Sequence, residues 1–218
     1  IAWAVGIAVF LRSFVIEAYK IPSGSMLPTL EVGDHIFVNK FLYGFQIPLT
    51  TTKFLQWRHP HRGEVIVFKY PNNIEQDYIK RVIGEPGDVI NVEGETLYVN
   101  GKAEPSDYVA DVDVYDQGCY PQRARLYTEH LDTGVDHARL ELLGRSSMFG
   151  SGPWTVPEGN LFVMGDNRDN SADSRTGFTV PYSYVKGRAM FVWLSWDSCG
   201  SFWPFQKIRV RRMGEVVR

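Results

Sequence analysis

Short apolar runs recur along most of this chain, and they constrain its fold more than any other feature of the sequence. Each run is rich in β-branched and aromatic residues and is bounded by Gly, Pro, Asn or Asp, which is typical of β-strands. The runs cover residues 34–38, 64–70, 77–83, 88–92, 96–99, 160–164 and 188–196. Gly94-Glu95 and Asn100-Gly101 lie between or directly after such runs and predict tight hairpin turns. We therefore expect a largely antiparallel β protein.

The β pattern weakens in the middle of the chain. From about Lys102 to Gly152, Asp, Gly, Ser, Arg and Tyr replace the alternating hydrophobic residues, and the pattern resumes near Trp154. A polar stretch of this kind between two β regions is typical of an insertion. Since 218 residues suffice for one substantial core, we expect one β body formed by 17–101 and 153–218, with 102–152 as an inserted subdomain.

The N-terminal segment is apolar but short. Residues 1–11 carry no charge, yet eleven helical residues span only about 16 Å, against roughly 30 Å of hydrocarbon in a bilayer. The segment is either a buried core helix or the distal half of a transmembrane helix that begins before Ile1. Arg12 is well placed to reach the membrane interface. This favours the second interpretation, with residues 1–16 as the C-terminal part of an anchor helix.

Composition narrows the functional classes. The formal charge of −2 gives no support for a protein that holds nucleic acid by bulk positive charge. Aromatic residues reach 14%, with six Trp, which suggests apolar surface for a peptide or a membrane. Four aromatic residues lie close together near the C-terminus, and they either close the β core or contact the membrane. These residues are Trp196, Phe202, Trp203 and Phe205.

The two cysteines leave two possibilities open. Cys119 and Cys199 form one disulfide in an oxidising compartment, or they are two buried thiols. Two cysteines make no zinc framework.

A rigid turn carries two hydroxyls near the start of the β region. In residues 21–30, Pro22 and Gly24 fix an extended, sharply turned backbone that carries Ser23 and Ser25. A turn of this kind presents Ser25 with its own N–H toward a developing oxyanion. The alternative interpretation is a turn without chemistry.

A lysine interrupts the apolar strand predicted at 77–83. If Lys80 faces the core, it must pair with a carboxylate or lose its proton. Burial and the neighbouring guanidinium of Arg81 would lower its pKa from about 10.4 to about 8. The resulting neutral amine is a general base. The alternative is an edge strand from which Lys80 reaches solvent.

A third unusual segment, residues 165–175, is almost entirely polar. It fails as a calcium loop: with Asp169 as position 1, the glycine and glutamate positions hold Ser174 and Val180. Its three Asp and two Arg suit an internally paired loop better than a metal cage. The five histidines have no metal-binding spacing. We expect neither a metal nor a cofactor.

These segments occur together in one order. P-S-G-S-M-x-P-T-L at 22–30 is followed by R-G-E-V-I-V-F-K-Y-P at 62–71, D-Y-I-K-R-V-I-G-x-P-G-D at 77–88 and G-D-N-R-D-N-S-A-D-S-R at 165–175. The order closely resembles the bacterial type I signal peptidases, most of all the Gram-negative ones. These are membrane-anchored Ser-Lys serine proteases that remove signal peptides from exported preproteins.

The resemblance implies a role for each matching residue. Ser25 corresponds to the nucleophile and Lys80 to its general base. The Ser23 hydroxyl would join the Ser25 N–H in the oxyanion hole, and Ser171 would orient the lysine amine. Two supporting ion pairs are implied, Asp173 with Arg175 and Asp166 with Arg168.

The resemblance also implies a setting. The fold would be coiled antiparallel β-sheets forming a catalytic core, with an inserted β-rich subdomain, preceded by the end of a transmembrane helix. The enzyme would be in the bacterial inner membrane, single or multi-pass, with its catalytic domain on the periplasmic side. Its partners would be signal-peptide-bearing preproteins and membrane phospholipid, not nucleic acid. An extended substrate would add to a β edge above small apolar pockets, lined by Ile21, Pro22, Met26, Leu30, Val67 and Ile79.

Two other classes of protein share parts of this pattern. A self-cleaving repressor of the Ser-Lys type uses related chemistry, but it carries a DNA-binding helical domain in place of an apolar anchor. A non-enzymatic, membrane-tethered β binding module would have the same composition and no need of Lys80.

Overall fold

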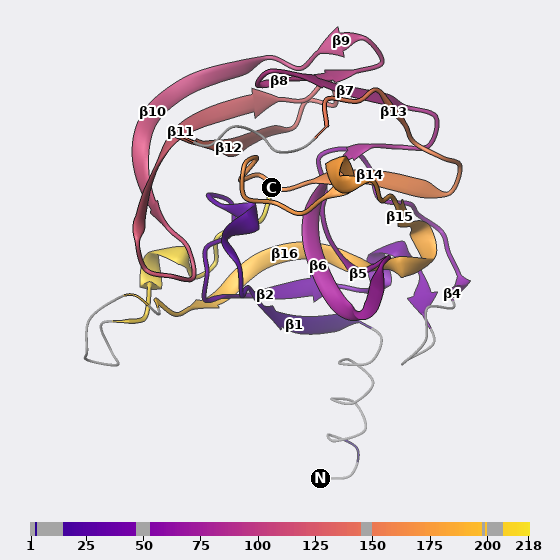
Figure 1. Ribbon diagram of the computed structural model, residues 1–218. Helices are drawn as coiled ribbons and strands as arrows, with labels where there is room; N and C mark the ends of the chain where they lie inside the picture. The colour runs from indigo at the N-terminus through magenta and orange to yellow at the C-terminus, as the bar shows by residue number, and fades with distance from the viewer. Residues whose placement is uncertain (1–2, 4–14, 47–52, 145–149, 198, 200–206) are drawn as a thin grey trace.

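A computed structural model describes residues 3, 15–46, 53–144, 150–197, 199 and 207–218. The described residues form four β-sheets in which every pair of neighbouring strands is antiparallel (Figure 1). The prediction of a mainly β, antiparallel protein is therefore confirmed. Among the described residues, no helix has the length and apolar character that crossing a bilayer requires.

The largest sheet brings the two ends of the β region together. Its seven strands are, in spatial order, β1 (Ile16–Lys20), β2 (Asp34–Asn39), β16 (Val185–Ser195), β5 (Val65–Tyr70), β6 (Asn73–Gly84), β14 (Asn160–Met164) and β15 (Val180–Pro181). Because β16 comes from near the C-terminus and lies between β2 and β5, the sheet is complete only when nearly the whole chain has folded.

Strands β5 and β6 form a hairpin that fixes the place of Lys80. Tyr70 pairs with Asn73, so a two-residue turn joins the strands, and the register sets Lys80 opposite Ile66. Strand β14 pairs with β6 only from Arg81 onward. The two halves of β6 therefore have different neighbours, and the change occurs at Lys80.

A four-stranded sheet follows directly along the chain. Its order is β13 (Trp154–Thr155), β7 (Val89–Glu93), β8 (Thr96–Val99) and β9 (Lys102–Ala103). The predicted hairpins at Gly94-Glu95 and Asn100-Gly101 are confirmed. Asn100 and Gly101 both have positive φ, 53° and 77°, which is the backbone that an Asn-Gly hairpin turn requires.

Three long strands form an arch over the upper left of the molecule in Figure 1. They are β10 (Ser106–Tyr115), β11 (Pro121–His130) and β12 (Asp136–Leu142). All three lie in the predicted insertion, which therefore contains regular β structure. Strand β9, at the start of that range, pairs with β8 instead, so its first residues continue the four-stranded sheet.

The remaining elements are short. Strands β3 (Phe45–Gln46) and β4 (Lys53–Leu55) form a two-stranded sheet. Single turns of 3₁₀ helix are η1 (Gly24–Met26), η2 (Phe41–Tyr43), η3 (Ser174–Thr176), η4 (Tyr182–Tyr184) and η6 (Val210–Arg212). The two cysteines, left open by the sequence, form a disulfide with their Cα atoms 5.3 Å apart.

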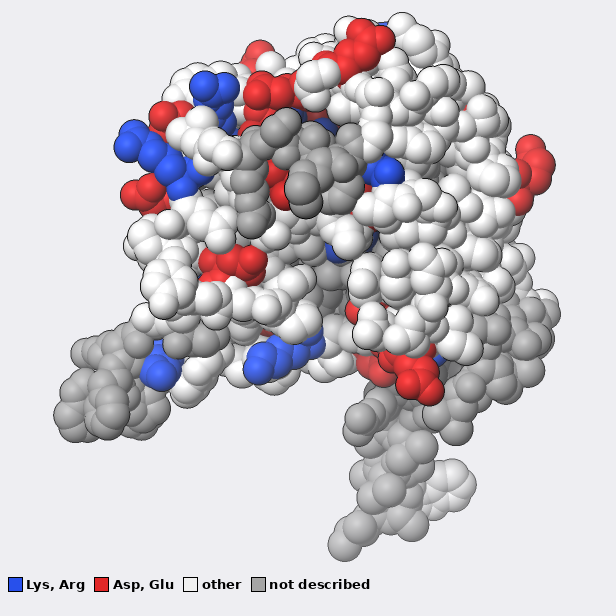
Figure 2. Space-filling view, viewed as in Figure 1, with Lys and Arg blue, Asp and Glu red and all other residues white. Residues whose placement is uncertain are grey.

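Charged residues of both signs share the surface. On the face shown in Figure 2, Lys and Arg side chains are scattered among Asp and Glu instead of forming one basic patch. This distribution agrees with the nearly balanced charge of the sequence.

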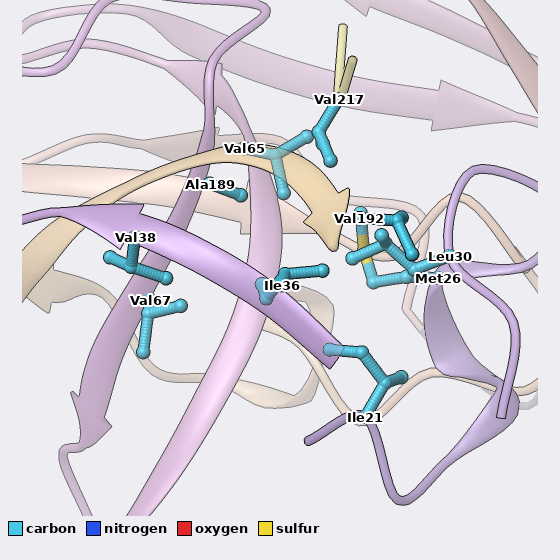
Figure 3. Packing of buried hydrophobic residues seen from close by; sticks show 10 residues of the cluster. All are labelled: Ile21, Met26, Leu30, Ile36, Val38, Val65, Val67, Ala189, Val192 and Val217. Carbon is cyan, nitrogen blue, oxygen red and sulfur yellow. The ribbon is translucent and has the colours of Figure 1, made fainter. Parts of the chain in front are cut away.

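The core next to the Ser25 turn is built from both halves of the chain. It joins the turn itself to strands β2, β5 and β16 and to the last residues (Figure 3). Its members are Ile21, Met26, Leu30, Ile36, Val38, Val65, Val67, Ala189, Val192 and Val217. Because the turn contributes three of its own side chains to this core, its position is fixed by packing as well as by its prolines.

This packing predicts a large cost for truncation within that core. Replacing fully buried Ile36 with Ala removes apolar contacts and leaves a cavity, so we expect the free energy of unfolding to fall by about 2–5 kcal/mol. Denaturant unfolding of the purified protein measures this change. Ile74→Ala, at a side chain 49% exposed on β6, is the control and should change stability by less than about 0.5 kcal/mol.

Candidate active site

The Ser25 turn connects β1 to β2. Ser23 has extended φ and ψ angles of −132° and 156°, and the chain then tightens into the single turn η1. Ser25 is in that turn and only 8% of it is exposed. Leu27, two residues later, packs against Ala124, Leu140 and Leu142 of β11 and β12. The turn is therefore held between the large sheet and the arch.

Lys80 lies directly against this serine. Its Nζ is 2.7 Å from Ser25 Oγ and donates a second hydrogen bond to Ile79 O at 2.9 Å. The two residues are 55 positions apart in the sequence. Lys80 is 4% exposed, so the snorkelling alternative does not describe its position. A buried amine in contact with a hydroxyl is the geometry of a nucleophile and its base.

The environment of Lys80 favours the neutral amine. Burial lowers its pKa from 10.5 to about 8, Asp173 and Asp166 oppose this change, and Arg175 supports it. The pKa near 8 that the sequence predicted agrees with this value. The guanidinium group that helps to lower it belongs to Arg175, however, and not to Arg81. The Arg81 side chain turns to Asp166 and to the carbonyl of Gly63, as expected when neighbouring residues of a strand point to opposite faces.

Asn167 fixes the peptide group that precedes Ser25. Its Nδ2 donates to Gly24 O at 3.0 Å, and its backbone N–H donates to Ser25 O at 3.2 Å. In a trans peptide the C=O and N–H point in opposite directions, so the Ser25 N–H points away from Asn167. None of the described residues accepts a hydrogen bond from that N–H. Ser23 Oγ lies 3.4 Å from Ser25 Oγ.

A buried ion pair links β6 to the polar loop at 165–175. Arg81 donates from Nε and from one terminal nitrogen to the two oxygens of Asp166, at 2.8 and 2.6 Å. Thr29, four residues after Ser25, donates to the same carboxylate at 2.5 Å. The charge of Arg81 and the hydrogen bond from Thr29 hold the pKa of the Asp166 carboxyl below its usual value, although burial acts in the opposite direction.

The expected pairing of Asp166 with Arg168 is wrong. Arg168 pairs instead with Glu129 on β11. The reason is geometric, because the Asp166 carboxylate already faces Arg81 and Thr29. Arg168, two residues later, reaches the arch, where Glu129 is 1% exposed.

Comparisons with known proteins identify the family of this chain. A family model described as signal peptidase, peptidase S26, matches residues 1–196. A signal peptidase I from Pseudomonas aeruginosa is 43% identical over 202 residues, which cover 87% of this chain and 69% of that protein. The chain belongs to the signal peptidase family.

Two further proteins extend the comparison. A signal peptidase I from Pseudomonas fluorescens is 41% identical over 205 residues, again 87% of this chain and 69% of that protein. A crystal structure of a signal peptidase I from Enterococcus faecalis is 30% identical and aligns over 60% of this chain and 97% of its own, with a TM-score of 0.38.

The remaining residues of the polar loop lie close to Ser25 and Lys80. Asp173 and Arg175 form a buried ion pair at 2.9 Å. Ser171 is 2% exposed, and its Oγ has no hydrogen-bond partner among the described residues. It does not hydrogen-bond Lys80 in this structure, so its predicted role in orienting the amine stays a prediction. Gly165 separates Ser171 from the turn, since a Cβ there would lie 2.4 Å from Ser25 O.

The residues predicted to line substrate pockets occupy two kinds of position. Ile21, Met26, Leu30 and Val67 are at most 2% exposed and belong to the core cluster of Figure 3. Ile79 is half-buried against that cluster, and Pro22 is exposed. The structure thus brings five of the six into the core cluster that packs under the Ser25 turn, and their role toward a substrate stays a prediction.

The predicted membrane-contact residues are only partly described. Trp196 is 36% exposed at the end of β16. Phe202, Trp203 and Phe205 lie outside the described residues, as does nearly all of the predicted anchor at 1–16, whose last residue begins β1.

A cavity of about 710 Å³ lies apart from the dyad. Glu95, Arg125, Glu141 and Arg168 are among its lining residues, and Ser25 and Lys80 are not. Burial raises the pKa of Glu141 to about 7. No cluster of metal-ligating side chains occurs in the described ranges.

Sequence reasoning missed four polar residues that touch the site or its support. Asn167 lies within the recognised polar motif, so its presence was visible but its contact was not. Asp116, Glu129 and His137 come from the arch, where no spacing or motif marks them. The sequence shows there only that charged residues recur along the segment, and a strand exposed to solvent has the same pattern.

The Glu129 network predicts a strong effect on stability. Glu129 faces Arg168, Arg139 at 3.2 Å and His137 at 3.3 Å, and Arg168 holds its pKa far below the usual range despite burial. Glu129→Gln leaves buried guanidinium groups without their counter-charge. We expect it to lower the free energy of unfolding at pH 7 by about 3–5 kcal/mol.

The pH dependence checks the cause. The native carboxylate is favoured, so its stabilisation is present above the unfolded pKa of about 4.3 and is lost as pH falls toward the native value. Denaturant titrations should show the gap between wild type and Glu129→Gln narrowing below about pH 4. Glu75→Gln, on exposed β6 surface, should match the wild type throughout.

Proposed function

We propose that this protein is a serine endopeptidase that removes N-terminal signal peptides from exported preproteins, with Ser25 as nucleophile and Lys80 as general base. The observation that carries the proposal is the 2.7 Å contact between Lys80 Nζ and Ser25 Oγ inside a buried site. Family membership supports the reaction class, and the lowered pKa of Lys80 supports its role as a base.

In the first step, Ser25 Oγ attacks the scissile carbonyl carbon. Its proton passes to the neutral Lys80 amine, and the carbonyl oxygen becomes an oxyanion. The Ser25 N–H, which points away from Asn167, and the Ser23 hydroxyl, 3.4 Å from Ser25 Oγ, would donate hydrogen bonds to that oxygen. Lys80 then returns the proton to the leaving amine as the C–N bond breaks, which leaves an acyl-enzyme on Ser25.

In the second step, water releases the signal peptide. Lys80, neutral again after protonating the amine, takes a proton from water as the oxygen attacks the ester. The same donors stabilise the second oxyanion, and Lys80 returns the proton to Ser25 Oγ. No metal or cofactor takes part in this scheme.

Strand β6 supports recognition of an extended substrate. Its residues 78–80 pair with β5 on one side, and no described strand pairs with them on the other. An added substrate strand would make main-chain hydrogen bonds there, beside half-buried Ile79 and exposed Pro22. Small side chains of the substrate would then face the apolar cluster under Ser25.

The membrane setting is part of the proposal. In it, the apolar segment before β1 belongs to a membrane anchor, the catalytic body lies on the periplasmic side of the bacterial inner membrane, and the aromatic residues Trp196, Phe202, Trp203 and Phe205 contact phospholipid. The disulfide supports an oxidising compartment.

Variants of the dyad test the proposed chemistry. Ser25→Ala removes the nucleophile and Lys80→Ala removes the base, so each should lower kcat/KM for a preprotein in detergent by a factor of about 10³ or more. Gel analysis of preprotein cleavage measures the rates. Ser183→Ala, an exposed serine, and Lys69→Ala, on neighbouring β5, are the controls. Wild-type rates for either dyad variant would contradict the assignment.

The rate should depend on pH in the direction that the lowered pKa sets. Because the charged amine cannot accept the serine proton, kcat/KM should fall about tenfold for each pH unit below the Lys80 pKa of about 8 and level off above it. Initial rates between pH 5.5 and 9.5 measure this limb. A flat profile over that range would exclude Lys80 as the base.

A further inference from the structure

The Ser25 turn lacks the cap that short helical turns normally have. The first N–H groups of such a turn have no partner within it, and the preceding Ser or Asp side chain usually accepts one of them. Ser23 holds that position and makes no such bond with its side chain. Its hydroxyl is turned toward Ser25 Oγ instead. Ser23, the residue in the capping position, therefore directs its hydroxyl toward Ser25 and not toward the main chain of the turn.

Asp116, far along the chain, supplies an acceptor for the first N–H of the turn. Its Oδ1 accepts a hydrogen bond from the Gly24 N–H at 2.9 Å, across 92 residues of sequence. A Cβ on residue 24 would lie 2.7 Å from this oxygen, so the approach requires the glycine. Gly24 is thereby held on both sides, by Asp116 at its N–H and by Asn167 at its C=O.

The carboxylate of Asp116 is itself fixed. Asn170, in the polar loop, donates to Oδ2 at 2.8 Å, and the Gln117 N–H donates to Oδ1 at 2.8 Å. Gln117 also donates from Nε2 to Pro22 O at 2.5 Å. Two consecutive residues of the β10–β11 turn thus bind the main chain on either side of Ser23.

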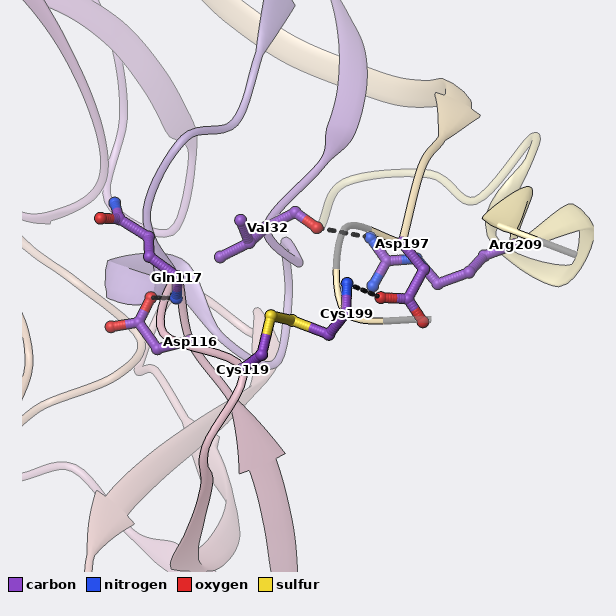
Figure 4. The surroundings of a disulfide bond; sticks show 7 residues. All are labelled: Val32, Asp116, Gln117, Cys119, Asp197, Cys199 and Arg209. Carbon is purple, nitrogen blue, oxygen red and sulfur yellow. Dashed lines mark hydrogen bonds between the residues drawn. A yellow bond between two sulfur atoms is a disulfide. The ribbon is translucent and has the colours of Figure 1, made fainter. Parts of the chain in front are cut away.

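The disulfide holds this turn in place. Cys119 N–H donates to Asp116 O at 2.9 Å, which closes the turn, and Cys119 is bonded to Cys199 (Figure 4). Cys119 has a φ of +57°, a conformation that non-glycine residues seldom adopt without an added constraint. The tip of a hairpin whose two strands have ten residues each would otherwise be free to move.

We infer that Asp116 is a positioning residue for the nucleophile and that the Cys119–Cys199 disulfide acts on catalysis through it. The inference rests on the proposed function of Ser25. Asp116 acts through the Ser23–Gly24 peptide group, whose orientation sets where Ser25 and its N–H lie relative to Lys80. Displacement of a reacting group by about 1 Å can cost a factor of about 10² in rate. The loss of this contact should therefore appear in kcat.

Steady-state kinetics on a preprotein in detergent tests the inference. We expect Asp116→Ala to lower kcat by about 10- to 100-fold with KM within about threefold of wild type. Asp116→Asn should recover most of kcat, since its amide oxygen can still accept from Gly24 and the Asn170 amide can turn to match it. Asp113→Ala is the matched control, because it removes an exposed carboxylate from β10, three residues before Asp116, and should leave both constants unchanged.

Reduction separates the disulfide from other effects. Cys119 is exposed, so a thiol reductant can open the bond, and free thiols can be counted. Opening it should lower kcat of the wild type several-fold and have little further effect on Asp116→Ala, because both changes act through one contact. The pair Cys119→Ser with Cys199→Ser should behave as the reduced wild type.

Three results would overturn the inference: a kcat for Asp116→Ala within about threefold of wild type, a loss confined to KM, or equal losses in the Ala and Asn variants. An equal effect of reduction in wild type and Asp116→Ala would overturn the part that concerns the disulfide. If Asp116→Ala does not fold, an unchanged kcat of the fully reduced wild type would still overturn the part that concerns the disulfide, because this measurement needs no substitution. An active Ser25→Ala, by contrast, would mark the failure of the proposed function itself.

Discussion

The buried pair between Arg81 and Asp166 is the interaction on which the rest of the site depends. Arg81 follows Lys80 on β6, and Asp166 opens the polar loop, so their two hydrogen bonds join the base strand to that loop. Thr29 brings the Ser25 segment to the same carboxylate. Three segments that are far apart in the sequence thus meet at one ion pair. With Arg81 directed there, the preceding side chain of the strand, Lys80, faces Ser25.

The same pairing explains how a lysine can stay neutral among carboxylates. Asp166 and Asp173 both raise the pKa of Lys80, and unpaired they would favour its charged form. Each is bound by its own arginine, Arg81 or Arg175, so little net negative charge faces the amine. Burial then decides the direction, and the pKa falls to about 8. Arg81 and Arg175 thus help to keep Lys80 neutral by pairing with the two carboxylates.

The sequence predicted what depends on local pattern and missed what depends on distant contacts. Seven apolar runs became strands β2, β5, β6, β7, β8, β14 and β16, because alternation and turn residues act within a few positions. Strands β10 and β11 were not predicted individually, because they carry few large apolar residues: the inner face of β10 is only half-buried, and only two residues of β11 are fully buried. Ser25 and Lys80 were found through motifs. The partner of Arg168 was not, since the choice between Asp166 and Glu129 is made by the fold.

The arch shows why an insertion with so little core of its own keeps one position. Its buried apolar residues, Ala124, Leu140 and Leu142, pack with Leu27 of the nucleophile turn and not with a separate centre. Its polar residues reach the same region, Glu129 to Arg168 and Asp116 to Gly24. A sheet of this kind gains much of its stability from the site it covers, because its buried apolar side chains pack there. By the same reasoning the site depends on the arch for the cap of its turn and for the counter-charge of its loop. The arch and the site therefore form one cooperative unit, although the sequence of the arch resembles an insertion.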